Sequence, residues 1–510
     1  MVSQPAISFT EASEMKKAGK ILKYLCFLAI LTAGLFKTNE IMAPKFTYAN
    51  SNWPSTATIS GFYDMEPDTV DVLFLGSSVM VNAFSPQQIY NDTGIRSYNL
   101  GSGHQSIFLS YYLLKEALRF QHPQAVVLDC RFCWELIPES VLNSGEGQIR
   151  LAIDPMKWSA VKREAVHDIC TRDPSQSELS YYLTNIRYHD RWKELSRSDF
   201  MPADIMCSPM KGYSAIAGTY EEVRLFEPSD ITGQAEMQPM MAEYLDRITA
   251  LCHENDIDLI LIDLPGNNMN DGIYNTLSYY AEKNGAEYFN FMLPDNFAML
   301  QEDAPRERLI THANFWGSQK LTAVMEGILQ RHGIAGATDA QYEETRGYYD
   351  ALKENFTLSD TDDIETYMRL LRNPRYAVLM AVNDDCSGAM SDTAREYWRQ
   401  LGLQYDLAGQ VRKSYYAVID GGQIREEMSD QLLRLQGTVD NGQAVFSLDS
   451  AGFYSGSICS ILIDGEEYSL NTKGLNIVVY DTLTDRVIDS VNIDIRADEG
   501  IRRKEQTEAG

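Results

Sequence analysis

One pattern limits the fold of this chain more than any other: from about residue 70, short β-branched or Leu-rich runs alternate with longer helical stretches. Strands that alternate with helices in this way form parallel sheets. We therefore expect an α/β domain. Its predicted strands cover residues 71–75, 96–100, 125–129, 258–264 and 288–291.

Local signals support the first strand-loop-helix unit of this domain. Ser85, Pro86 and Gln88 have the spacing of a capping box with proline at the first helical position, and Gly94 is placed to end the helix. Residues 135–235 break the rhythm, with few clean strand patterns. We interpret them as an insertion or cap over the sheet.

A chain of 510 residues is long enough for two or three folded units. The first domain is predicted to span residues 70–334 and to end with a helix over residues 314–330. Residues 335–363 then form an acidic helical connector, and residues 364–495 restart the alternation, which predicts a smaller α/β or mixed domain. The charged tail, residues 496–510, is expected to be disordered. The second domain should contain strands at residues 376–382, 415–419, 457–463, 475–480 and 487–493, and a helix at residues 391–401.

The N-terminal segment differs from the rest of the chain. Residues 1–20 are basic, and residues 21–37 form an apolar run that predicts a transmembrane anchor if the Lys23 side chain reaches the headgroups. A cleaved signal peptide would look similar, although no small-x-small cleavage site follows, and a buried core helix is a third interpretation. Because the lysines precede the run, the positive-inside rule puts the N-terminus in the cytoplasm and everything after the anchor, starting with a linker of residues 38–69, outside it.

Composition and the cysteine pattern bound the chemistry. A formal charge of −28 would repel a phosphate backbone, so we expect no nucleic-acid partner. The chain has no Gly-x-Gly-x-x-G or phosphate-binding loop pattern, and we predict no cofactor and no metal. Cys130 and Cys133 form a C-x-x-C without a second such pair, which favours structural cysteines over a metal or redox site.

Two predicted strands end in small polar residues. Gly76, Ser77 and Ser78 follow the first strand, and Asn99 and Gly101 end the second. Ligands bind beyond the carboxyl ends of strands in open parallel sheets, which makes Ser78 a candidate nucleophile. The backbone amides of Ser78 and Gly101 could then stabilise an oxyanion. Each segment alone could equally be a simple turn.

A histidine lies near the end of the same domain. His312 follows the last predicted strand and directly precedes a helix, so its ring can reach over the strand ends and take a proton from a serine hydroxyl. His104, in the loop of Gly101, is an alternative base. His122, His253 and His332 lie in patterns that look solvated.

In this order and at these strand ends, the three segments resemble the SGNH/GDSL hydrolase family over roughly residues 70–332. Gly76-Ser77-Ser78 is similar to the family's Gly-Asp-Ser, with Ser77 in the Asp position, and to the Gly-Ser-Ser of the branch that includes the D-alanyl transfer protein of teichoic acid synthesis and alginate-type acetyltransferases. Gly101 matches the second block's glycine, and His312 with Ala-Asn-x-x-Gly matches the fifth block. The resemblance implies a flavodoxin-like three-layer sandwich with a parallel sheet.

The chain departs from the family pattern at two positions. The Asp that usually precedes the histidine by three residues is Leu309 here, although Asp303 or Glu302 could replace it. The family's third-block Asn, an oxyanion donor, is missing after the third strand, where Asp129 and Arg131 stand as candidates without an assigned role.

The second domain carries its own resemblance. Residues 376–388 (YAVLMAVNDDCSG), 414–419 and 473–479 look like pieces of the interleukin-like EMT inducer (ILEI/PANDER) domain, in an order that implies a circular permutation. That family includes a carbohydrate-binding stem domain, which implies glycan binding. Without the resemblance, Asp384, Asp385 and Asp406 read as solvated loop acids.

Together these features predict a membrane-anchored, extracytoplasmic enzyme that transfers or removes O-acyl groups on an envelope polysaccharide, with Ser78 acylated and His312 as base. The resemblance implies a multipass membrane acyltransferase as a partner. The competing prediction, favoured by Leu309, is a catalytically weak or inactive surface protein that uses the same scaffold to bind glycans.

Overall fold

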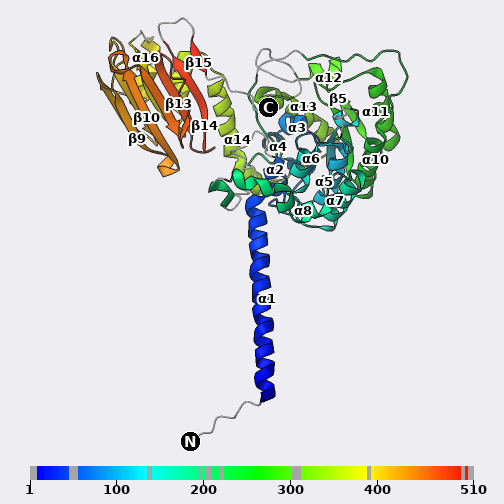
Figure 1. Cartoon of the computed structure of the whole chain (residues 1–510). Helices are drawn as coiled ribbons and strands as arrows, with labels where there is room; N and C mark the ends of the chain where they lie inside the picture. The colour runs from blue at the N-terminus through cyan, green and yellow to red at the C-terminus, as the bar shows by residue number, and fades with distance from the viewer. Residues whose placement is uncertain are drawn as a thin grey trace. The chain divides into compact units, whose positions relative to one another are not determined.

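The computed structural model describes residues 9–44, 55–134, 140–195, 197–200, 209–218, 223–300, 312–387, 392–494 and 500–503. The chain divides into two compact units, Met1–Ala337 and Thr338–Gly510 (Figure 1). Each unit is described by itself.

A five-stranded, all-parallel sheet forms the centre of the first unit and confirms the predicted α/β class. The strand order is β2-β1-β3-β4-β5, one of the two common orders of doubly wound sheets. All five predicted strands are present, with bounds that differ by at most one residue at either end. They are β1 (Val72–Leu75), β2 (Ser97–Asn99), β3 (Ala125–Asp129), β4 (Asp258–Asp263) and β5 (Glu287–Asn290).

Helices pack on both faces of this sheet. Alternate strand residues such as Phe74 and Ile260 form a buried cluster with Met325 of α13. The strand residues between them, such as Leu73, are equally buried on the face where α5 and α10 lie against each other. The helices of this unit include α2 (Ser55–Phe62), α3 (Ser78–Ala83), α4 (Pro86–Thr93), α5 (Ile107–Ala117), α10 (Pro239–Glu254), α11 (Asp271–Asn284), α12 (Pro294–Ala298) and α13 (Phe315–Arg331).

The predicted start and end of α4 are confirmed, although the Ser85 backbone N–H donates to Thr322 Oγ1 at 3.1 Å, so the predicted capping box is formed only by its serine half. Ser85 Oγ accepts from the Gln88 backbone N–H, Pro86 is the first helical residue, and Gly94 ends the helix at a φ of 75°. A left-handed φ of this kind favours glycine.

The predicted insertion, residues 135–235, contains helices and no strand in its described part. It comprises α6 (Glu146–Ile153), α7 (Ala160–Arg172), α8 (Glu178–Tyr182), α9 (Asn185–Tyr188) and the short 3₁₀ turns η2 (His189–Lys193) and η3 (Arg197–Phe200). The first helix of the chain, α1 (Phe9–Met42), includes a stretch, Gly19–Met42, long and apolar enough to cross a membrane. The predicted anchor, residues 21–37, lies wholly inside this stretch.

The second unit is a curled, mixed sheet with helices on one side. β6 pairs with β13 along one edge and with β7 and β10 along the other, and among the described strands of this unit only the β6–β10 pair is parallel. The sheet curls so that its inner side chains, such as Leu379 and Phe446, form one core, while Met380 belongs to a second core that includes Trp398 of α16. Its strands are β6 (Tyr376–Asp384), β7 (Ser414–Asp420), β8 (Gln423–Ser429), β9 (Leu433–Val439), β10 (Ala444–Gly452), β11 (Ile458–Ile463), β12 (Glu466–Glu467), β13 (Gly474–Asp481), β14 (Arg486–Ile493) and β15 (Ile501–Arg503); its helices are α14 (Ala340–Ser359), α15 (Ile364–Leu370) and α16 (Asp392–Gln400).

Two expectations for this unit are wrong. Residues 501–503 belong to the tail that was expected to be disordered, but they form β15, which pairs with β14 and is held by Arg503 through the carbonyl of Thr361 and the buried Asp489. Asp385 was expected to be solvated, but its side chain is buried and accepts from the Ser387 backbone N–H at 2.8 Å.

Candidate active site

The turn after β1 brings the ends of β1 and β3 close together. A Cβ atom on Gly76 would lie 2.7 Å from Asp129 Cβ and 3.0 Å from Met80 Cβ, so the backbone can pass only if this residue is glycine. Ser77 directly precedes α3 without a side-chain capping bond, and Ser78 is the first residue of that helix. Ser78 therefore lies just beyond the carboxyl end of β1, as predicted.

This position coincides with the point where the strand order reverses. The chain passes from β1 to β2 on one side and then crosses to β3 on the other. In open parallel sheets, the crevice at such a reversal is where ligands bind.

Ser78 and His312 are in hydrogen-bonding contact, although they are 234 positions apart in the sequence. Ser78 Oγ lies 2.8 Å from His312 Nε2. The hydroxyl donates to this nitrogen when the ring carries its proton on Nδ1. The predicted convergence of the two side chains over one edge of the sheet is therefore present, and the geometry permits transfer of the hydroxyl proton to the ring.

His312 precedes α13, and the start of this helix fixes its place. The Asn314 side chain caps the helix by accepting from the Gly317 backbone N–H at 2.9 Å. The Asn and the Gly of the His-Ala-Asn-Phe-Trp-Gly sequence are therefore the two partners of the bond that starts the helix.

A crossing segment, residues 209–218, connects the elements around this pair. Its backbone bonds to β2 (Asn99 N–H to the carbonyl of Lys211, 2.9 Å), to α3 (Ser214 N–H to the carbonyl of Val81, 3.0 Å) and to the start of α13 (Phe315 N–H to the carbonyl of Ile216, 2.9 Å). Sequence reasoning placed this segment inside the cap and gave it no role. Its one local signal is Gly212, which adopts a φ of 88°.

The expected use of Gly101 as an oxyanion donor is not supported. Its backbone N–H already donates to Asn99 Oδ1 at 3.1 Å. The Asn99 side chain is fully buried and its amide nitrogen donates to the Met80 carbonyl at 2.8 Å, so Asn99 fixes the turn instead of facing a ligand. The turn is also packed tightly here, since a Cβ on Gly101 would lie 2.7 Å from Val81 Cγ2.

The remaining candidates fall into three groups. Ser77 Oγ is buried and has no hydrogen-bond partner among the described residues. His104 is exposed, and its ring packs edge-on against Phe132 rather than pairing with Ser78. Asp303, Glu302 and Leu309 lie outside the described residues. That Asp303 or Glu302 orients His312 therefore stays a prediction.

An acid cluster, which we define as Asp129, Asp263, Asn267 and Tyr288, lies at the carboxyl ends of β3 and β4, where the Tyr288 side chain reaches it from the neighbouring β5. Asn267 Nδ2 donates to Asp263 Oδ1 at 2.8 Å and is 3.5 Å from Asp129 Oδ1. The Tyr288 hydroxyl donates to Asp263 Oδ2 at 2.7 Å. Burial, with a smaller contribution from the charge of Asp129, raises the pKa of Asp263 to about 7.

A cavity of about 280 Å³ opens at this cluster. This volume is at the lower end of small-molecule pockets. Its wall includes Cys130, Arg131, Trp134, Asp263, Asn267 and Ile273. Two polar groups in this wall, the Trp134 indole N–H and Asn267 Oδ1, are buried without a hydrogen-bond partner in the described part of the chain.

Only part of this wall was anticipated. Asp129 and Arg131 were candidates, whereas Asp263, Asn267 and Tyr288 were missed. The signal that could have found Asp263 is an aspartate at the end of an apolar strand, since two such strands in a parallel sheet bring their final carboxylates to one edge.

Cysteine and acidic side chains were the remaining candidates for metal ligands. Cys130 and Cys133 are buried, free thiols, and burial together with the neighbouring Cys133 raises the pKa of Cys130 well above its ordinary value. A thiol that stays protonated is a poor ligand and nucleophile. Across the described residues, no three His, Cys, Asp or Glu side chains are grouped as a metal site would require.

Comparisons of the chain with models of known protein families and with curated proteins each found no match.

Proposed function

We propose that this chain is a membrane-anchored, extracytoplasmic serine enzyme of the SGNH type, which transfers or hydrolyses O-acyl groups on an envelope polysaccharide. One observation carries the proposal: the 2.8 Å contact between Ser78 Oγ and His312 Nε2, at the reversal point of a parallel sheet. A hydroxyl paired with an imidazole in a sheet-edge crevice is the arrangement that activates a serine nucleophile.

The chemistry follows from this pair. Ser78 Oγ attacks the ester carbonyl carbon while its proton passes to His312 Nε2. The tetrahedral intermediate then collapses, and the leaving alkoxide takes that proton back as the acyl group stays on Ser78. A water molecule or an acceptor hydroxyl, deprotonated by the same ring, next attacks the acyl-serine and restores the free hydroxyl.

An oxyanion donor is available beside the nucleophile. Ser78 is the first residue of α3, and the first backbone N–H groups of a helix have no partner within it. We assign the developing negative charge to the Ser78 amide. Gly101 can contribute only after Asn99 Oδ1 releases its N–H.

The cavity at the acid cluster is the proposed site for the polar group that carries the ester. Trp134 offers a donor, Asn267 Oδ1 offers an acceptor, and Arg131 lines the same wall. Hydroxyl-rich groups satisfy donors and acceptors together. A sugar ring therefore suits this wall.

Labelling with a fluorophosphonate probe tests the proposal on the full chain in detergent. Wild type should be labelled, and Ser78→Ala should abolish the signal because the acceptor atom is gone. His312→Gln should slow labelling by about 10²- to 10⁴-fold, the usual contribution of a general base. The matched controls are Ser175→Ala, an exposed serine, and His253→Gln, an exposed histidine bonded to the carbonyl of Asn284; both should label like wild type.

The second candidate function is a glycan-binding protein that no longer catalyses. The engaged Gly101 N–H favours it, since one expected oxyanion donor is committed elsewhere. Absent labelling of wild type, or labelling that survives Ser78→Ala, would reject the enzyme and leave this alternative.

A further inference from the structure

The insertion of the first unit carries a set of large apolar side chains on its outside. Leu179, Tyr182, Leu183 and Ile186, in and between α8 and α9, are 41–56% exposed, and Trp192 in η2 is 62% exposed. We call these five residues the apolar patch. Segments of a soluble surface normally turn such side chains toward the core.

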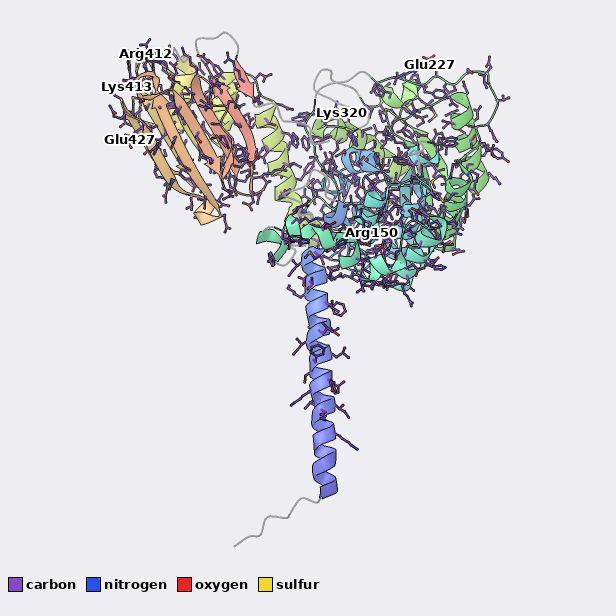
Figure 2. The ribbon with its side chains drawn as sticks, in the orientation of Figure 1. Arg150, Glu227, Lys320, Arg412, Lys413 and Glu427 are labelled. Atoms are coloured by element: carbon purple, nitrogen blue, oxygen red, sulfur yellow. The ribbon has the colours of Figure 1, made fainter. Side chains whose placement is uncertain are left out.

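The side of α8 that faces the interior is fixed by buried contacts, so the patch residues on this helix cannot turn inward. Arg150, labelled in Figure 2, is buried, donates to the carbonyl of Ser180 at 3.1 Å and places its guanidinium 3.7 Å from the centre of the Tyr181 ring. Ser180 and Tyr181 are themselves buried. Their neighbours Leu179 and Tyr182 are consequently held on the outer side.

The same segment is bonded to the C-terminal end of α1. The Asn185 backbone N–H donates to Asn39 Oδ1 at 2.9 Å, and Arg191 donates to the carbonyl of Met42 at 2.8 Å. In Figure 1, α1 ends at these elements of the insertion. The patch therefore begins where the apolar helix ends.

Helix geometry gives the distance along the membrane normal between the end of the apolar run and the residues of α1 that contact the insertion. The apolar run of α1 ends at Phe36, and the exposed Lys37–Glu40 ion pair follows it. Asn39 is three residues beyond Phe36, which is about 4.5 Å along the axis. The headgroup layer on each side of a bilayer is about 5–7 Å thick. If α1 spans a membrane, α9 starts within that layer.

We propose that the apolar patch lies on the surface of the same bilayer that holds α1, with Trp192 and Tyr182 at the level of the headgroups. Continuity with the end of α1 identifies lipid as the occupant, and Trp and Tyr are the side chains that prefer this interface. The first unit would then be attached to the membrane twice. This inference rests on the proposed anchor, and does not depend on the proposed catalysis.

Tryptophan quenching tests the contact with the full chain in nanodiscs. Phosphatidylcholine brominated in the upper part of its acyl chains quenches indoles that touch it. Trp192→Phe should reduce the quenched emission by roughly the share of one of the six tryptophans, relative to unbrominated lipid. The matched control is Trp398→Phe, which removes a buried tryptophan of the second unit and should leave the quenched emission unchanged.

Each outcome has one meaning. Equal quenched emission in wild type and Trp192→Phe, with the protein retained on the membrane after a carbonate wash, overturns the patch and leaves the anchor. Release by carbonate overturns both. Probe labelling in detergent should be the same for Trp192→Phe and wild type. Labelling therefore tests the catalytic proposal alone, and quenching tests the membrane contact alone.

Discussion

At the scale of single residues, Gly76 decides whether the site can form at all. The missing Cβ allows the turn after β1 to pass within van der Waals distance of Asp129 on β3. Any side chain there would push the two strand ends apart, together with Ser78.

Gly76→Ala should therefore lower the free energy of unfolding by about 1–3 kcal/mol, the usual cost of overpacking, and reduce probe labelling. Denaturant titration and labelling measure the two effects. Gly327→Ala in α13 is the control, because a Cβ there meets nothing within 4 Å. Its stability should stay equal or rise by up to about 1 kcal/mol. Equal behaviour of the two variants would contradict the steric argument.

Asp263 should make the first unit less stable at alkaline pH. Its pKa is about 7 in the folded state because the carboxyl is buried, against an ordinary value of 3.8. Between these values the folded chain keeps a proton that the unfolded chain has lost. The stabilisation is complete below the lower pKa, falls by about 1.4 kcal/mol per pH unit between the two pKa values, and is lost once the pH has risen through 7.

Asp263→Asn should flatten this slope, since the amide does not titrate. Denaturant unfolding at pH 5, 6, 7 and 8 measures it, and Asp256→Asn, at an exposed position, should keep the wild-type slope. A slope that survives in Asp263→Asn would assign the effect to another group.

At the scale of elements, the crossing segment depends on one glycine. Gly212 has a φ of 88°, and a Cβ there would lie 1.9 Å from the carbonyl oxygen of Asn99. Gly212→Ala should detach residues 209–218 from β2, and so disturb the support of α3 and of the start of α13.

We expect this variant to lose about 1–3 kcal/mol of stability and to label more slowly with the probe. Gly233→Ala, where a Cβ has open space, should match wild type in both measurements. Unchanged labelling in a folded Gly212→Ala protein would show that the segment does not position the pair.

The elements that the sequence predicted are those with local causes. The five buried strands of the first sheet, the capped helix α4 and the start of α13 each follow from residues next to one another. In contrast, β8 and β9 alternate buried or half-buried with exposed positions and carry Arg, Glu and Gln, so no apolar run marked them. Their pairing with β7 and β10 is decided by the fold.

The site follows the same division. Ser78 could be placed from the sequence because it follows the strand-end rule, and His312 could be paired with it because it precedes the last helix of the same domain, as in the resembling family. The engagement of Gly101 by Asn99 could not, because it depends on where the Asn99 side chain points after β2 has formed. The acid cluster was missed for a similar reason: Asp263, Asn267 and Tyr288 meet only through the register of β4 and β5.

At the scale of the whole molecule, each unit has its own apolar core, so each should fold without the other. A protease site inserted between Ala337 and Thr338 should yield two fragments that each unfold cooperatively, measured by circular dichroism on the separated products. Insertion four residues earlier, within the turn that follows α13, is the control and should destabilise the first fragment, because the Ala337 N–H bonds back to Gly94. A fragment without a cooperative transition would show that the boundary is wrong.

The last described strand, β15, also protects the second unit from pairing with other copies of the chain. β15 covers the free edge of β14 with three residues and is held there by Arg503. A chain shortened to the end of β14 would lose only Ile501 from the two cores, yet would leave that edge bare. Bare strand edges recruit strands from neighbouring molecules, so such a protein would aggregate while still being folded.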